Sequence, residues 1–371
     1  MWLFSIVMIL ILVFVGVING LTPKFSRQAT PFGVAVNGKH DYVEERKNNY
    51  LKWNIIGSIL LALPLFIFPF MENVSAAELF ASMYVTFAIL IFMAYSILLY
   101  FKYRKEIKEW RKDLPEDERS KVRKVVVDLN YHNKIQSKSN WSFLLWQAVI
   151  ILIPVVIAFS FYDRIPNEIP INWDAQFNVN RTMSKSIWTV LALPGIQVLM
   201  IPVLIYSNYS IIKSKQRLSP LDPEDASEKS LQFRQAWSNF TFAMTIGTQL
   251  LMSSMFLYSL FSQGKYGWII VGIVAIFLIF TLGGTVYLSL KYGQGGEKLL
   301  TEEEQYYADP DDEDLWKLGM IYYNPEDPSI FVEKRFGVGP TLNMARWQAW
   351  AFSGGMVLFT ILLIVWSYTL T

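Results

Sequence analysis

Long apolar stretches alternate with polar ones along this chain, and the pattern predicts a bundle of membrane-crossing helices. A helix needs about 20 apolar residues to cross the hydrocarbon core of a bilayer. Eight stretches fit this requirement, namely Trp2–Asn19, Asn54–Met71, Leu79–Phe101, Ser142–Phe161, Ile187–Tyr206, Ser238–Phe261, Trp268–Lys291 and Ala349–Thr369. We therefore expect an all-α polytopic membrane protein with about eight transmembrane helices.

Two of these stretches carry further information about the chain. Only the short QGKYG turn separates Ser238–Phe261 from Trp268–Lys291, so these two stretches are predicted to form an antiparallel pair. The first stretch lacks a basic region before it, and the sequence VGVINGLTP offers no small-x-small cleavage site. We therefore expect an uncleaved first helix rather than a signal peptide.

The polar region before the last apolar stretch has two parts. Residues 301–314, TEEEQYYADPDDED, hold eight acidic residues and are interpreted as a solvated acidic linker. The β-prone runs Ile321–Tyr323 and Ile330–Val332 follow, separated by NPEDP, whose composition is that of a turn. We expect a small β-containing cytoplasmic element here, just before the last helix.

These elements divide the chain into five regions. They are a three-helix membrane region with basic loops (1–141), a helix pair around the loop 162–186 (142–206), a cytoplasmic loop with a helical hairpin (207–291), an acidic linker with a small cytoplasmic domain (292–348), and the last helix (349–371).

Composition supports a membrane protein and excludes several kinds of chemistry. Hydrophobic residues make up 53% of the chain and charged residues 17%, against about 25% charged residues in typical soluble domains. The chain has no cysteine, and its only histidines are His40 and His132. Disulfides and Cys/His zinc sites are therefore excluded or nearly so, and we expect no cofactor and no metal.

The distribution of basic residues predicts the orientation. Alternate loops hold 29 of the 33 Lys and Arg residues, and the other loops hold four. The positive-inside rule places the first set in the cytoplasm, so both termini and the loop 162–186 are expected outside. The most basic loop, 102–141, has a helix-start pattern at Asp113–Glu116 and the run RSKVRK, which favours contact with anionic membrane lipids. Nucleic acid is not an expected partner, because stacking aromatics are not interleaved with these charges.

The apolar stretches themselves carry little reactive chemistry. No Asp, Glu, Lys, Arg or His lies clearly at mid-membrane depth, which argues against a proton-driven pump and an intramembrane protease. In the stretch from Ser238, the side chains of Thr241, Thr245 and Gln249 recur at helical spacing. This polar stripe either lines a water-filled path or makes hydrogen bonds between helices, and the second interpretation is favoured.

The loop 162–186 resembles a known motif. Residues 163–185, DRIPNEIPINWDAQFNVNRTMSK, are similar in spacing to the extracytoplasmic motif of the Sdp-type immunity proteins. The matching residues are Ile165-Pro166, Ile169-Pro170, Trp173 and Ser184-Lys185. The sequence departs from that motif at Asn172, Asp174, Phe177 and Asn180. The resemblance implies a non-enzymatic bacterial membrane protein in immunity to a secreted peptide, or in signalling.

Residues 314–347 resemble a second family, a short uncharacterised domain of Gram-positive membrane proteins. The features that match are Trp316, Gly319, Tyr322-Tyr323-Asn324-Pro325, Asp327-Pro328, Phe331-Val332, Gly337, Gly339 and Asn343. This family brings no assigned chemistry.

Two hypotheses of different classes result, with an enzyme as a weaker third. In the first, the outer loop binds a secreted peptide or an envelope component through Pro166, Pro170, Asn172, Trp173, Asp174 and Lys185. A cytoplasmic partner is then bound by Trp316, Tyr322, Tyr323, Asn324, Asp327 and Asn343. In the second, the protein is a transporter or channel with a polar path along Thr241, Thr245 and Gln249. An enzyme is not expected, because no spaced catalytic set accompanies the acids and His132 in the loops.

Overall fold

The computed structural model describes residues 2–115, 138–173, 178–215, 219, 221–262, 265–307 and 313–369. Within these residues, seven helices are long and apolar enough to cross a membrane. An eighth apolar helix, Trp347–Thr369, lies at the end of the chain. The expected all-α polytopic membrane protein is therefore confirmed, with each apolar stretch forming a helix.

Most of the helices are longer than their apolar stretches. The eight are α1 (Trp2–Phe25), α2 (Asp41–Ala62), α3 (Val74–Trp110), α6 (Asn140–Ser160), α7 (Ile187–Lys213), α8 (Pro223–Phe261), α9 (Gly267–Tyr292) and α11 (Trp347–Thr369). Helix α8 has 39 residues and is therefore about 58 Å long, whereas the hydrocarbon core is about 30 Å thick. The Asp222 side chain caps α8, and Pro223 occupies the first position, where its missing N–H costs nothing.

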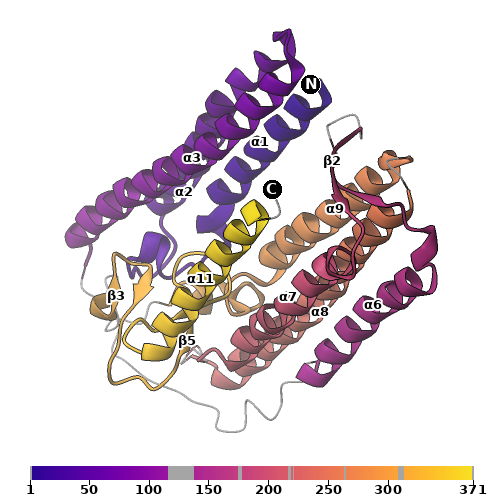
Figure 1. Ribbon diagram of the computed structural model, residues 1–371. Helices are drawn as coiled ribbons and strands as arrows, with labels where there is room; N and C mark the ends of the chain where they lie inside the picture. The colour runs from indigo at the N-terminus through magenta and orange to yellow at the C-terminus, as the bar shows by residue number, and fades with distance from the viewer. Residues whose placement is uncertain are drawn as a thin grey trace.

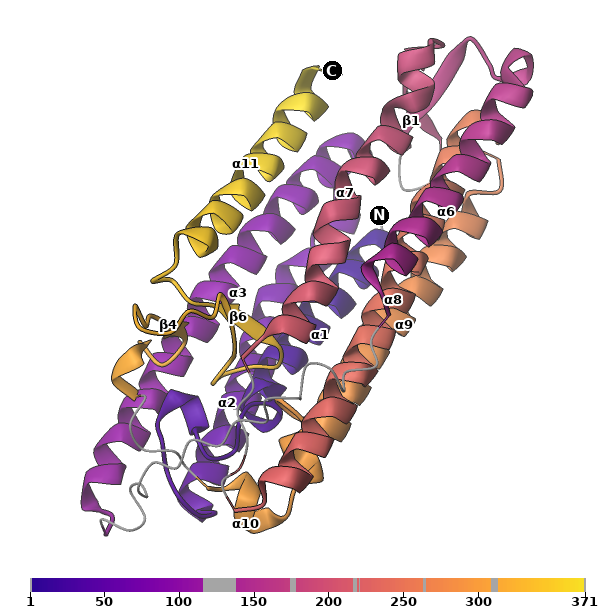
Figure 2. The ribbon, with the colours of Figure 1, turned by 90° about the horizontal axis from the view of Figure 1, so that it is seen from below.

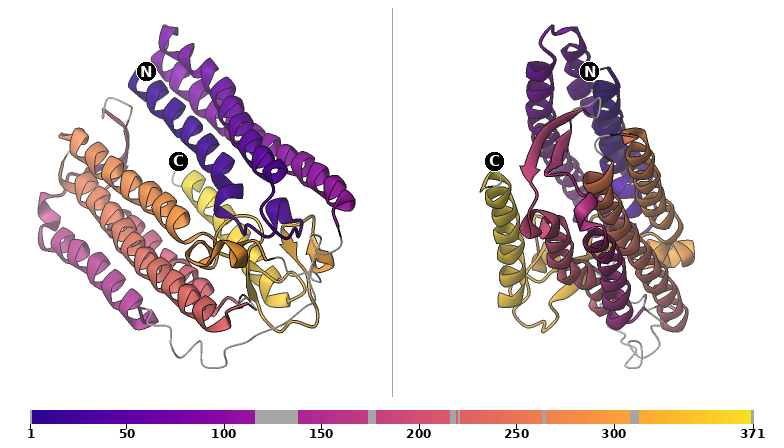
Figure 3. Two further views of the ribbon diagram at one scale, coloured as in Figure 1. Left: turned by 180° about the vertical axis from the view of Figure 1, so that it is seen from behind. Right: turned by 45° about the vertical axis from the view of Figure 1, so that its right-hand side comes forward.

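The helices form two bundles that meet at one end. Helices α1, α2 and α3 pack on one another, and α6, α7, α8 and α9 form the second bundle. Figures 1 and 3 show the two bundles running side by side in similar directions, with the C-terminal strands at one end and the yellow helix α11 beside them. We name the end where they meet the junction end, and the opposite end of the second bundle, which carries the strands β1 and β2, the hairpin end.

Within the described part of the chain, six short strands form three antiparallel pairs. Strands β1 (Glu168–Trp173) and β2 (Val179–Ser184) make a hairpin between α6 and α7. The pairs β3 (Trp316–Lys317) with β4 (Ile321–Tyr322), and β5 (Phe331–Glu333) with β6 (Pro340–Leu342), lie at the junction end. Both β-prone runs predicted from the sequence are confirmed as strands. They do not pair with each other, because each pairs with a neighbour on its other side.

The acidic segment is more ordered than a solvated linker. Thr301 and Glu304 form a reciprocal capping box around the short helix α10 (Glu302–Gln305), and Glu304 is buried. Glu313 receives a 2.7 Å hydrogen bond from Arg111 at the end of α3. The prediction of a solvated linker is therefore wrong for Glu304, which is buried, and for Glu313, which is paired with Arg111, whereas Glu302 and Glu303 are exposed as it requires; residues 308–312 lie outside the described part.

The basic loop after α3 is described only at its two ends. Helix α3 ends in a 3-10 turn at Arg111–Asp113, and the next described residues after Pro115 begin at Lys138. Glu116, His132 and the run RSKVRK therefore lie outside the described residues, and the predicted helix start and lipid contact stay predictions.

An aromatic core joins the first bundle to the C-terminal part of the chain. Phe32, in the segment after α1, is fully buried among Tyr50, Tyr100, Tyr103 and Phe336. The Tyr100 hydroxyl donates to the carbonyls of Phe32 and Leu318, at 3.0 and 3.1 Å. Figure 2 shows this region, where residues 26–40, the C-terminal hairpins and α10 gather at the junction end.

Candidate functional site

The hairpin is held firmly against the second bundle. Ile165 and Ile169 are buried among apolar residues of α6, α7 and α8, including Phe256. Ser259 of α8 donates a 2.5 Å hydrogen bond to the carbonyl of Pro170, and the Trp173 ring packs on Tyr258 with 5.6 Å between centroids. The hairpin is thus presented at the end of α8 as a supported strand pair, which the sequence did not predict.

The residues proposed to bind a ligand in this loop therefore fall into two groups. Pro170 is buried, Trp173 packs on α8, and the Lys185 ammonium donates to the carbonyl of Ile165 and lies 4.5 Å from the Tyr162 ring centroid. These three side chains hold the hairpin in place. Asn172 is exposed and Pro166 partly exposed, and Asp174 lies outside the described residues.

A cluster of neutral amides joins three helices inside the second bundle. Gln147 of α6, Gln197 of α7 and Gln249 of α8 are all buried. Gln249 donates to the Gln147 side-chain oxygen at 3.0 Å, and Gln197 donates to the Gln249 side-chain oxygen at 3.1 Å. Because these groups are uncharged and bonded to one another, the cluster satisfies polar atoms in the membrane without burying a charge. With Ser253 it is called the glutamine cluster below.

Ser253 shows why a hydroxyl is placed in this cluster. Pro154 has no N–H, so it leaves the carbonyl of Ile150, four residues earlier in α6, without its helical donor. The Ser253 hydroxyl donates to that carbonyl at 3.1 Å and accepts from Gln197 at 3.2 Å. A residue of α8 thereby compensates for the proline in α6.

The polar stripe of α8 does not act as one surface. Gln249 belongs to the glutamine cluster, as the interpretation of hydrogen bonding between helices required. Thr241 and Thr245 instead line a cavity with residues of α7, α9 and the β5–β6 hairpin. One part of the stripe therefore lies in the glutamine cluster and the other part lines the cavity.

Buried charges gather at the junction end. Arg234 of α8 is fully buried, and it donates at 2.9, 3.1 and 2.8 Å to the carbonyls of Ile211, Ile212 and Ser214, at the end of α7. It also donates to a Glu333 carboxylate oxygen at 3.1 Å. The guanidinium thus caps α7, whose C-terminus favours a cation, and fixes the strand β5 to both helices.

The same carboxylate reaches the first bundle. Arg27, just after α1, donates to the second Glu333 oxygen at 3.0 Å, and its Nε lies 3.9 Å from Glu297. The set of Arg27, Arg234, Glu297 and Glu333 is called the arginine–glutamate junction below. It joins α1, α7, α8, the segment after α9, and β5 through one connected group of charges.

Glu297 has an unusual environment for a carboxylate. Burial raises the pKa of this carboxyl to about 8, against the lowering effects of Arg27 and of the hydrogen bond from the Gln28 N–H at 2.8 Å. Lys47 of α2 donates to the Gln28 side chain at 2.6 Å and to Glu44 at 2.7 Å. Protonation of Glu297 therefore changes the charge beside Arg27 after α1, Lys47 of α2 and Glu333 of β5.

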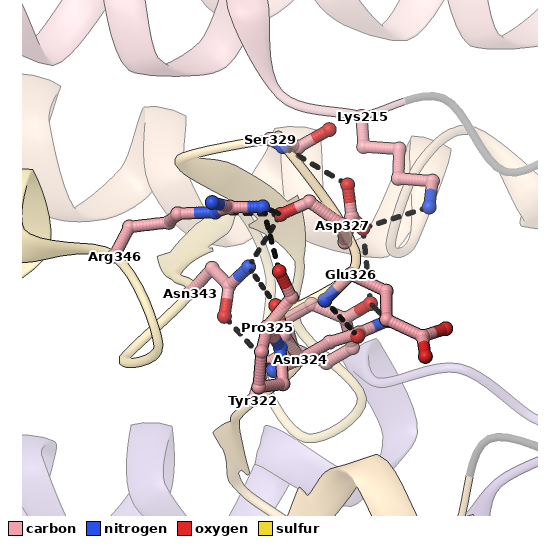
Figure 4. Close-up of polar contacts among 9 residues, drawn as sticks. All are labelled: Lys215, Tyr322, Asn324, Pro325, Glu326, Asp327, Ser329, Asn343 and Arg346. Atoms are coloured by element: carbon pink, nitrogen blue, oxygen red, sulfur yellow. Dashed lines mark hydrogen bonds and ion pairs between the residues drawn. The ribbon is translucent and has the colours of Figure 1, made fainter.

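The residues proposed as a partner surface are mostly internal contacts (Figure 4). Asn343 is fully buried, and its side chain donates to the carbonyls of Asn324 and Asp327 and accepts from the Asn324 N–H at 3.0 Å. The Asp327 carboxylate accepts from Lys215 at 2.7 Å and from the Tyr322 hydroxyl at 3.0 Å. These side chains hold the C-terminal hairpins to each other and to the end of α7.

Only part of that proposed surface is open to a partner. Trp316 and Tyr322 are buried and pack on each other at 5.0 Å between centroids, whereas the Tyr323 side chain is 45% exposed. Lys215 and Arg346 hold Asp327 from two sides, with Arg346 donating to the Asp327 carbonyl at 2.7 Å through Nε. Tyr323 therefore stays the member of this set that is placed to meet another molecule.

The described residues contain no group of three or more His, Cys, Asp or Glu side chains placed to hold a metal ion. The two clusters that sequence reasoning missed differ in how visible they were. One glutamine in each of three predicted spans is a pattern that the sequence shows. Arg234 and Glu333 lie 99 positions apart and carry no local signal of their pairing.

Two sequence-family models match parts of the chain. A domain of unknown function (DUF1648) matches residues 149–198, which include the whole β1–β2 hairpin. A family of unknown function (DUF5808) matches residues 325–350, which include β5, β6 and the start of α11. No curated protein and no solved structure matches the chain. The two matches fit a multi-pass membrane protein, and neither model is one of Sdp-type immunity proteins, so that resemblance stays a prediction.

Proposed function

We propose that this integral membrane protein is a non-enzymatic receptor of the bacterial cell membrane, which binds a secreted peptide or an envelope component at the hairpin end. The displacement of the hairpin on binding is transmitted to the junction end, where it changes the contact with a cytoplasmic protein partner. Immunity to a peptide toxin is the form of this function that the resemblance of residues 163–185 favours.

The observation that carries the proposal is the course of α8. This one helix holds the hairpin at Tyr258 and Ser259 and reaches the arginine–glutamate junction at Arg234. A hydrogen-bonded helix moves as a unit, so a displacement of the hairpin is felt at its other end. The distribution of Lys and Arg, by the positive-inside rule, supports an outer position for the hairpin and a cytoplasmic position for the junction.

The hairpin is also suited to binding because it is held in one conformation. A loop that is ordered before binding loses less conformational entropy when a ligand arrives. Asn172 is exposed on β1, and Val179 on β2 is 39% exposed. These side chains, rather than Pro170 or Lys185, form the proposed contact surface.

Photo-crosslinking in native membranes tests the proposal. A photoreactive residue at Asn172 is expected to label a secreted peptide or an envelope component, whereas the same residue at Ile187 serves as an exposed control at the start of α7. A second photoreactive residue at Tyr323 is expected to label a protein partner, in a yield that changes when the ligand is added. A strain without the gene is expected to become sensitive to at least one secreted peptide of its own species.

Two results would contradict the proposal. One is unchanged sensitivity of the deletion strain to every such peptide, together with equal labelling from Asn172 and Ile187. The other is labelling from Tyr323 that is independent of ligand even though the hairpin binds it. The second result would leave a binding protein without transmission through α8.

Transport is a second candidate, favoured by the cavity that Thr241 and Thr245 line. The glutamine cluster lies next along α8, with its amides bonded to one another. Flux through reconstituted protein is expected to change in Gln249→Leu if this helix lines a path. Flux absent from the wild type, or identical in the variant, would remove the transport candidate.

A further inference from the structure

A cavity of about 370 Å³ lies between the second bundle and the C-terminal element. It is lined by side chains of α7, α8 and α9 and covered by Val338, Gly339 and Pro340 of the β5–β6 turn. Gln294 fixes this cover by donating to the Gly339 carbonyl at 3.0 Å and accepting from its N–H at 2.6 Å. The volume equals about twelve water molecules and falls within the range of small-molecule sites.

The wall of the cavity is apolar with hydroxyl groups set into it. Leu204, Ile211 and Met244 supply apolar surface, and hydroxyls come from three helices. Most of these hydroxyls donate to a carbonyl of their own helix: Thr248 bonds to Met244, and Thr285 of α9 to Thr281. Their oxygens are left as acceptors facing the space.

Two buried donors in this wall have no partner. Thr245 is 1% exposed, and its hydroxyl makes no hydrogen bond with any described residue. The Trp237 indole N–H is buried and likewise lacks a partner among the described residues. An unmade hydrogen bond at a buried polar atom is costly, so two such groups in one cavity wall indicate that a ligand completes them.

The charge of the wall restricts that ligand. Of the described residues that line the cavity, none is Lys, Arg or His. The single acid, Glu333, is held by Arg27 and Arg234. An anionic ligand would be repelled by the Glu333 carboxylate and would find no cationic side chain among the described residues of the wall. A cationic ligand would compete with the guanidiniums of Arg27 and Arg234 for that carboxylate. An uncharged ligand avoids both costs.

The surroundings also indicate where the ligand comes from. Thr285 of α9 lines the cavity, and the most apolar 18-residue window of α9 contains no buried residue, so this helix borders both the cavity and the surrounding lipid. We propose that the cavity binds an uncharged single-chain amphiphile from the membrane, whose hydroxyl or amide group bonds with Thr245 and Trp237. This site is separate from the hairpin surface and does not depend on the receptor function.

Photolabelling of the full chain in lipid nanodiscs tests this site. The probes are three single-chain photoreactive lipids of equal length, ending in an alcohol, a carboxylate or a primary amine. The alcohol is expected to label the α7 and α8 segments of the cavity wall in a saturable way, and unlabelled alcohol is expected to compete. Thr245→Val is expected to reduce this labelling about fivefold, the loss expected for one hydrogen bond.

The matched control is Thr86→Val, because the Thr86 side chain is exposed on α3 and donates to the Ser82 carbonyl. Its labelling is expected to equal that of the wild type. Thr245→Val without ligand is expected to melt at the same temperature as the wild type or higher, since it removes an unpaired hydroxyl. Equal labelling by the three probes, unsaturable labelling, no loss in Thr245→Val, or a lower melting temperature of that variant would each overturn the proposal.

Discussion

The glutamine cluster and the arginine–glutamate junction connect helices of the same bundle by different chemistry. The cluster joins α6, α7 and α8 with neutral amides, and the junction joins α7, α8 and β5 with buried charges and reaches the end of α1 through Arg27. A charge at the centre of a bilayer is expensive, whereas a neutral amide can satisfy itself with a neighbour. We therefore expect the glutamine cluster to lie nearer the membrane centre than the arginine–glutamate junction.

The largest effect is expected when the junction loses its shared acid. Glu333→Gln removes the carboxylate that Arg234 and Arg27 share, and breaking a buried pair on one side costs about 3–5 kcal/mol. Denaturant titration in detergent, followed by circular dichroism, measures the free energy of unfolding. The control is Glu302→Gln, because the Glu302 and Lys39 side chains are 67% and 55% exposed and such a pair contributes about 1 kcal/mol or less. Equal losses in the two variants would mean that the junction is no stronger than a surface ion pair.

The second-largest loss of stability is expected from Asn343, a neutral side chain in the C-terminal element. Asn343→Ala removes hydrogen bonds to two carbonyls and two N–H groups and is expected to cost about 2–3 kcal/mol. Asn49 makes one exposed bond of 3.4 Å, so Asn49→Ala is expected to cost little. Hydrogen exchange of the β5–β6 segment should rise in the first variant alone. Unchanged exchange there would show that Asn343 does not hold the C-terminal hairpins.

The glutamine cluster is expected to give a smaller effect than the junction. Gln249→Leu breaks its bonds to Gln147 and Gln197, and polar contacts between membrane helices contribute about 1–2 kcal/mol. Gln232→Leu changes an exposed position of the same helix and serves as the control in the same unfolding measurement. A loss as large as that of Glu333→Gln would contradict the distinction between neutral and charged clusters.

The smallest effect on stability is expected from the protonation of Asp327 at low pH. Hydrogen bonds from Lys215 and Ser329 lower the pKa of Asp327 below its ordinary value of 3.8, although burial opposes them. The stability that this shift adds is complete above pH 3.8 and is lost as pH falls through the lower pKa of the folded state. The melting temperatures of the wild type and of Asp327→Asn should therefore converge as pH drops below about 4. A difference that stays constant down to pH 2 would show that the charge of Asp327 is not its source.

The helices were predictable because a segment that crosses the hydrocarbon core must be apolar over about 20 residues. All eight apolar stretches form helices, but their polar extensions were missed, as at Asp41 in α2 and Pro223 in α8. A hydropathy window reports the part of a helix that lipid surrounds and ends where solvent begins. The start of α8 did carry a readable signal, since Asp222 followed by Pro223 and acidic residues is a typical helix beginning.

The polar clusters and the candidate site residues were predictable only where the pattern is local. Thr241, Thr245 and Gln249 were found from their helical spacing, and the β-prone runs around NPEDP were found from composition. The roles of Trp173, Lys185 and Asn343 were not evident, because a residue that fixes a loop and one that binds a ligand look alike in sequence. Their partners, such as Tyr258 for Trp173, come from distant helices.

The contacts of Ser26 and Arg27 also set the order in which the protein is made. The Ser26 hydroxyl accepts from the Gly337 N–H, and Arg27 pairs with Glu333, positions separated by 311 and 306 residues. The ribosome releases the first helix long before either partner exists. A messenger that stops short of Glu333 therefore encodes α1 to α9 but neither α11 nor the carboxylate that Arg27 and Arg234 share.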